Sequence, residues 1–257
     1  MPPNKISPPL LRGLPSAIVL AASMLVVGSP APAAEIDHAA EYQACLALAG
    51  RTPTDALESA RSWEELGGGN AARHCAATAL FTLRRYREAA IAFDELAAEI
   101  AVDRGLTAGL YEQAGRAWLL AEEALEALAD FTLAIALEPE RADHYVSRSY
   151  AHAARQDYPS VLADLARAAE LDPVHPEVPL LRAAALRFQG DLPSALVQAE
   201  QAIVLAPGNP EAFLERGNIL ALQGDAPAAA RDWRQAIALA PDSVAAGNAR
   251  RNLARQP

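Results

Sequence analysis

Leu137-Glu138-Pro139 is the first of four related phrases that decide the fold of this 257-residue chain. The others are Leu171-Asp172-Pro173, Leu205-Ala206-Pro207 and Leu239-Ala240-Pro241. Their prolines, Pro139, Pro173, Pro207 and Pro241, follow one another at a fixed interval of 34 residues. A fixed period of this length indicates an array of small structural units. Each proline ends a helix, because it lacks the N–H that would continue the helical hydrogen bonds. The phrases therefore predict a stack of helical units.

Small and large residues recur inside the same period. With the repeated proline as position 32, the units begin at Ala108, Ala142, Pro176 and Pro210. Position 8 is always small, and its residues are Gly115, Ser149, Ala183 and Gly217. Position 24 is large in three of the four units, and its residues are Phe131, Leu165, Ala199 and Trp233. Small residues let two helices approach closely, and the large residues fill the space between them.

This pattern resembles the tetratricopeptide repeat, a helix–turn–helix unit with the same period. The resemblance covers residues 108–241 and implies an all-α fold, an α-solenoid (superhelix) of about five to six units. The predicted organisation is a pair of degenerate helical repeats over 35–107, four clear units and a capping helix over 244–257. The four units occupy 108–141, 142–175, 176–209 and 210–243.

Turn residues support these boundaries. Asn209-Pro210-Glu211 combines a capping side chain, a proline at the first helical position and an acid in the first turn, so it predicts a helix start. Gly190-Asp191 and Gly224-Asp225 fall between the two helices of their units. Glycine adopts the left-handed conformation that ends a helix, and aspartate caps the helix that follows.

Residues 1–34 are typical of a secretory signal peptide. Lys5 and Arg12 precede a short apolar run over 14–28, and Ala31-Pro32-Ala33 then offers a cleavage site after Ala33 or Ala34. The alternative is an uncleaved anchor, although the run is shorter than the roughly 20 residues that a transmembrane helix needs. We expect a periplasmic location in a bacterial envelope, with no stable membrane insertion once the signal is removed.

The two cysteines, Cys45 and Cys75, fall in the first helices of consecutive units. First helices of neighbouring units pack side by side, and an even number of cysteines in an exported chain favours a disulfide. The sequence therefore predicts a Cys45–Cys75 bridge. A pair of buried free thiols is the alternative.

Charge and motifs argue against several classes of function. The formal net charge is −10, and an acidic chain repels the phosphates of nucleic acids. The five histidines and two cysteines show no metal-ligand spacing, and Gly67-Gly68-Gly69 lacks the features of a phosphate loop. We expect no enzyme activity, no cofactor and no metal.

The resemblance implies a binding groove on the concave face, lined by the first helix of each unit. The residues that it places there include Arg116, Val146, Tyr150, Leu180, Phe188, Leu214 and Asn218. Tyr150 and Phe188 are the expected anchors, because aromatic residues dominate interface energetics. Asp143, Glu177 and Glu211 fall along one rim. The alternative is that these residues pack against the chain's own helices.

The expected function is that of an adaptor or assembly scaffold in the envelope. Its partner would be a protein or peptide with apolar anchors. The alternative is a self-assembling structural repeat protein of the periplasm, and a concentration-dependent size in solution would favour it.

Overall fold

The computed structural model describes residues 37–100 and 102–255, so the predicted signal peptide lies outside the described residues. Within them the chain forms thirteen α-helices, one short segment (η1) that is kinked at Gly67, and no strand. The elements are α1 (His38–Ala49), α2 (Pro53–Trp63), η1 (Glu64–Gly68), α3 (Gly69–Thr82), α4 (Tyr86–Glu99), α5 (Arg104–Leu120), α6 (Ala124–Leu137), α7 (Ala142–Ala154), α8 (Tyr158–Leu171), α9 (Val178–Gln189), α10 (Leu192–Leu205), α11 (Pro210–Leu222), α12 (Ala226–Leu239) and α13 (Val244–Arg255).

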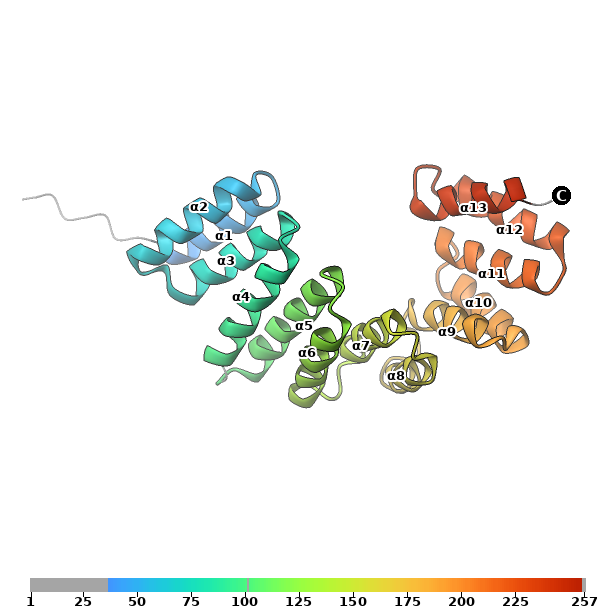
Figure 1. The fold of residues 1–257 in the computed structure, drawn as a ribbon, viewed down its shortest axis with the longest axis horizontal. Helices are drawn as coiled ribbons and strands as arrows, with labels where there is room; N and C mark the ends of the chain where they lie inside the picture. Colours follow the sequence, from blue (N-terminus) through green and yellow to red (C-terminus); the bar gives the residue numbers. More distant parts are fainter. Residues whose placement is uncertain (1–36, 101, 256–257) are drawn as a thin grey trace, which may run out of the picture. The chain divides into compact units, whose positions relative to one another are not determined.

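The helices stack in sequence order, as Figure 1 shows from α1 to α13. Each helix packs on the next one, most extensively α5 on α6, followed equally by α11 on α12 and α4 on α5. First helices of neighbouring pairs also touch, as α1 does with α3 and α9 with α11. The all-α solenoid predicted from the repeated phrases is therefore confirmed. None of the helices in the described ranges is both long and apolar enough to cross a membrane.

The repeated phrases mark helix ends as predicted. The last residues of α6, α8, α10 and α12 are the repeated leucines, and the repeated proline follows shortly after each of them. The Asn209 side chain accepts a hydrogen bond from the Glu211 amide at 2.9 Å and caps α11. Asp191 and Asp225 cap α10 and α12 in the same way.

The small residue at position 8 is explained by direct contact with position 24. A Cβ atom on Gly115 would lie 2.7 Å from the Phe131 ring, and a Cβ on Gly217 would lie 2.7 Å from the Trp233 ring. Both aromatic side chains are buried. The two helices of these units are held so close that only glycine fits opposite the aromatic ring.

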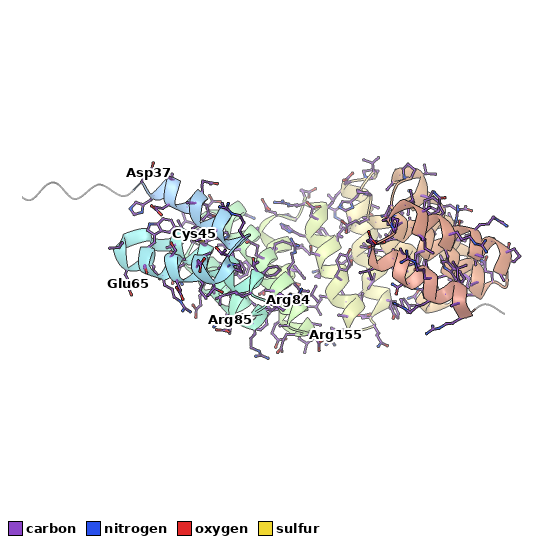
Figure 2. The ribbon with its side chains drawn as sticks, turned by 90° about the horizontal axis from the view of Figure 1, so that it is seen from above. Asp37, Cys45, Glu65, Arg84, Arg85 and Arg155 are labelled. Atoms are coloured by element: carbon purple, nitrogen blue, oxygen red, sulfur yellow. A yellow bond between two sulfur atoms is a disulfide. The ribbon has the colours of Figure 1, made fainter. Side chains whose placement is uncertain are left out.

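The turn between the two helices of each clear unit needs one left-handed residue. Gly190 and Gly224 supply it with φ of +85° and +90°, as their sequence context predicts. Glu122 and Gln156 occupy the same position in the two preceding units with φ of +64° and +59°. Arg84, beside Arg85 in the turn between α3 and α4, does the same in the preceding pair of helices (Figure 2).

The N-terminal helical pair departs from the expected form at its end. The second helix of this pair, α2, ends at Trp63 and continues as η1. Gly67 and Gly69 take positive φ on either side of Gly68. A Cβ on Gly68 would lie 2.7 Å from the Trp63 ring, so the tryptophan packs directly on this backbone. Gly68 is thus packed closely in the joint that leads into α3, whereas Gly67 and Gly69 are exposed and supply the backbone turn.

Cys45 on α1 and Cys75 on α3 come together as a disulfide pair, with their Cα atoms 6.1 Å apart (Figure 2 labels Cys45). Both side chains are buried, and they pack with Ala60 of α2. A cross-link at this place ties together the first helices of the two degenerate units.

Candidate interaction groove

A hollow of about 610 Å³ lies between α5 and α7, and it joins three of the sequence-predicted groove residues. These are Arg116 on α5 and Val146 and Tyr150 on α7. Its lining mixes apolar and charged side chains and is completed by Glu112, Leu119, Leu120, Phe131, Arg141, Asp143, His144, Ser147, His175 and Glu177. The groove is therefore partly polar in these units.

The floor of the hollow is built around His144, which is only 1% exposed. Its Nδ1 lies 2.9 Å from Glu112 Oε2, and its Nε2 lies 3.2 Å from Glu138 Oε2. Ser147 donates its hydroxyl hydrogen bond to the other oxygen of Glu112. Burial by itself lowers the pKa of His144, but the hydrogen bonds to the two carboxylates outweigh it, so the net pKa is raised.

The acidic rim predicted from the sequence is present but already engaged. Tyr150 donates its hydroxyl hydrogen bond to Glu177 Oε2 at 2.9 Å, and burial together with Glu177 raises the pKa of the phenol. Asp143 lies 3.2 Å from His175 Nε2 and 3.6 Å from Arg141 Nε. Each rim acid of the hollow thus has a partner of its own.

Arg116 differs from these groups, because it is exposed and makes no ion pair with any described residue. Its side chain also lines a smaller hollow of about 140 Å³ between α3 and α5. Thr78, Phe81, Phe93 and Gln113 complete that hollow. Arg116 therefore lies at the border of two neighbouring hollows.

A separate hollow of about 480 Å³ contains Asn218 at the C-terminal end of the stack. The Asn218 side-chain oxygen accepts hydrogen bonds from Trp233 Nε1 at 3.1 Å and from Asn252 Nδ2 at 2.8 Å. The amide predicted to contact a partner thus joins α11 to α12 and α13. Only its NH₂ group remains for a ligand.

Three large apolar side chains at position 13 remain exposed: Leu120 by 51%, Phe188 by 57% and Leu222 by 60%. Phe188 is held between two neighbours. Its ring stacks on Tyr158 with centroids 5.1 Å apart, and the Arg187 guanidinium lies 4.3 Å from its centroid. A fixed, exposed aromatic ring is a suitable anchor for a partner, because little entropy is lost when it is contacted.

Other predicted groove residues serve packing instead. Val146 is only 5% exposed and belongs to a core cluster with Val161 and Leu165. Leu214 is half-buried against the cluster around Trp233. Leu180 is also half-buried and lines none of the hollows described above. The alternative reading, packing against the chain's own helices, is thus correct for Val146 and Leu214.

The sequence did not indicate His144 as the centre of a polar cluster. The ring is brought to Glu112 by the stacking of α7 on α5, a contact between neighbouring units that no local motif encodes. In the described part of the chain, no group of three or more His, Cys, Asp or Glu side chains is arranged to hold a metal ion.

No protein-family model matches the chain, and no curated protein matches it. Solved structures do match. A tetratricopeptide repeat protein from Parabacteroides merdae has a TM-score of 0.65 at 15% identity, covering 86% of each chain. TTC0263 from Thermus thermophilus has 0.61 at 19%, covering 72% of this chain and all of that one. YrrB, described as having an unusual peptide-binding site, has 0.52 at 22%, covering 74% and 96%. The chain is therefore a protein of the tetratricopeptide-repeat fold.

Proposed function

We propose that this chain is a protein-interaction scaffold of the bacterial envelope that holds a segment of a partner protein against its first helices. The observation that carries the proposal is the exposure of three large apolar side chains at position 13, one of which, Leu120, lines the hollow that contains Tyr150. Apolar side chains exposed together usually mark an interaction site. A scaffold needs no catalytic group, and we assign none.

The partner segment is expected to carry apolar anchors. Leu120, Phe188 and Leu222 occupy the same position of the first, third and fourth clear units. A segment that runs along the first helices would meet them in succession. YrrB, a protein of the same fold, is described as having a peptide-binding site, which is compatible with this mode of binding.

The envelope location rests on two observations. Residues 1–34 have the composition of a secretory signal. The Cys45–Cys75 pair suits an oxidising compartment such as the periplasm, because cytosolic thiols are kept reduced. Cell fractionation of the full-length chain, with N-terminal sequencing of the mature form, tests both signal cleavage and location.

The binding role is tested by cross-linking in cells, with mass spectrometry of the captured partners. The test variant combines Tyr150→Ala with Phe188→Ala. A matched control combines Leu125→Ala with Val197→Ala, because these side chains are at least as exposed as the test pair but lie on the second helices α6 and α10. We expect one partner to be captured by the native chain and the control and lost by the test variant.

Two other results would contradict the proposal. If the test variant captures the partner as well as the native chain does, the groove is not the binding site. Capture of further copies of the chain alone, by both variants, would instead support a self-assembling structural protein.

A further inference from the structure

His144 lies at the junction of three segments under the hollow between α5 and α7. It belongs to α7, Glu112 belongs to α5, and Glu138 follows the last residue of α6. Each ring nitrogen lies within hydrogen-bonding distance of a carboxylate oxygen, at 2.9 Å for Nδ1 and 3.2 Å for Nε2. One buried ring therefore connects both neighbouring elements to α7.

The number of protons on the ring follows from the hydrogen bonds of the two carboxylates. A neutral imidazole has one N–H and one lone pair, whereas an imidazolium donates from both nitrogens. Glu112 also accepts from Ser147, and the Glu138 oxygen that faces the ring also accepts from Arg141 at 3.2 Å. Both carboxylates are thus acceptors already. A neutral ring would place its lone pair against a carboxylate lone pair.

We infer that His144 is a doubly protonated clamp beneath the groove, and that loss of one ring proton releases one of its two carboxylates. Release would free either the segment after α6 or α5 from α7, on which Val146 and Tyr150 are carried. The shape of the hollow would then depend on pH. This inference rests on the proposed function only where it assumes that a partner binds in the hollow. The protonation and release of His144 can be measured without a partner.

The surrounding charges come from every packed element. On α5, Glu112 favours the charged ring, and Arg116 lines the same hollow. In the segment after α6, Glu138 favours the charged ring and Arg141 opposes it. On α7 and before α9, Asp143 and His175 pair with each other, and Glu177 pairs with Tyr150. The carboxylates in contact with the ring outweigh the nearest cation.

The direction of the pH effect follows from linkage. Burial lowers the pKa of His144, but the hydrogen bonds outweigh burial and hold this pKa above its usual value of 6.5. A group with a raised folded-state pKa adds stability that is fully present below its unfolded pKa and is lost as pH rises through the folded pKa. The clamp is therefore closed below the usual histidine pKa and opens as the pH rises through a folded-state pKa that lies above 6.5.

The experiment is nuclear magnetic resonance of the full chain between about pH 6 and pH 9.5, the range around an unperturbed histidine. Ring nitrogen shifts report the protonation of His144. Amide hydrogen exchange, corrected for the intrinsic rate at each pH, reports the opening of α7 and of the segment after α6. We expect His144 to lose its second ring proton at a pH above the usual value of 6.5. Protection of those amides should fall by about tenfold when the ring deprotonates, which corresponds to one charge-assisted hydrogen bond.

His144→Gln should show low protection that no longer changes with pH. His175→Gln is the matched control, because it removes a histidine from the same hollow, and it should behave as the native chain does. If His144→Gln does not fold, Glu138→Gln serves, since it keeps the ring and should lower the pKa of His144. A His144 ring that loses its second proton at or below the usual value of 6.5, or protection independent of pH in the native chain, would overturn the inference.

Discussion

The third and fourth clear units have the same helix–turn–helix backbone, but different side chains fill the space between their helices. In the fourth unit, Gly217 at position 8 faces the large Trp233 at position 24. In the third unit the same positions hold Ala183 and Ala199, both fully buried. The space beside the two alanines is closed by Ile219, which reaches in from the fourth unit, and by leucines of α9 and α10. The repeat thus preserves the filled volume between helices rather than the residue that fills it.

The two units also differ in one ion pair. Arg216 at position 7 of the fourth unit makes two hydrogen bonds with Asp232 at position 23, at 2.7 and 2.8 Å. The second unit has the same pair in Arg148 and Asp164. In the third unit an arginine remains but its acid is replaced by glutamine. Arg182 Nε and Gln198 Oε1 are both buried, and neither has a hydrogen-bond partner among the described residues.

Removing the Trp233 side chain should have the largest effect on the free energy of unfolding. Trp233→Ala should lower the free energy of unfolding by about 3–5 kcal/mol, because it leaves a large cavity beside Gly217. Ala199→Gly, at the same position of the third unit, should cost only about 1 kcal/mol, mainly through helix propensity. Urea unfolding followed by circular dichroism measures both variants. Equal losses would mean that the third unit depends on position 24 as strongly as the fourth does.

Changing the residue at position 23 should alter the free energy of unfolding by an intermediate amount. We expect a loss of stability in the fourth unit and a gain in the third. Asp232→Asn should cost about 2 kcal/mol, because it leaves the partly buried Arg216 without its carboxylate. Gln198→Asp should gain about 1 kcal/mol, since it gives Arg182 the acid that its counterparts have. The same unfolding experiment applies, with added salt as a control that weakens only the electrostatic part. A loss of stability in Gln198→Asp would show that Arg182 is not positioned to pair.

The sequence predicted most of the fold because the repeat is encoded locally. The proline period, the small side chain at position 8 and the Gly-Asp turns each specify a helix end or a close contact within one unit. The non-glycine residues at the left-handed position were not predicted, since Glu122 and Gln156 give no turn signal. They are held there by the packed helices on either side, which is a tertiary effect.

The candidate site was less predictable because it depends on contacts between units. Position alone placed Arg116 and Tyr150 on the same face, and both line one hollow, but it could not show that Val146 is buried. Nor could it show pairings that cross units. Asp130 has Ala114 where other units have arginine, and it faces Asp94 instead. Burial, followed by the neighbouring Asp94 carboxyl, raises the pKa of Asp130 to about 8.

Replacing the glycine of the turn should have the smallest effect on the free energy of unfolding. This effect should be the same in both units, so it tests the backbone that the two units share. Gly190 and Gly224 have φ of +85° and +90°, a region in which a Cβ atom is strained. Neither position has another atom within 4 Å of an added Cβ, so backbone strain is the only cost. Gly190→Ala and Gly224→Ala should each lose about 1 kcal/mol by urea unfolding. Replacement by asparagine should lose less, because asparagine tolerates this conformation. If the two alanine variants lose unequal amounts of unfolding free energy, the cost of the turn depends on the side chains packed beside it. The backbone of the unit and its core packing would then not be independent.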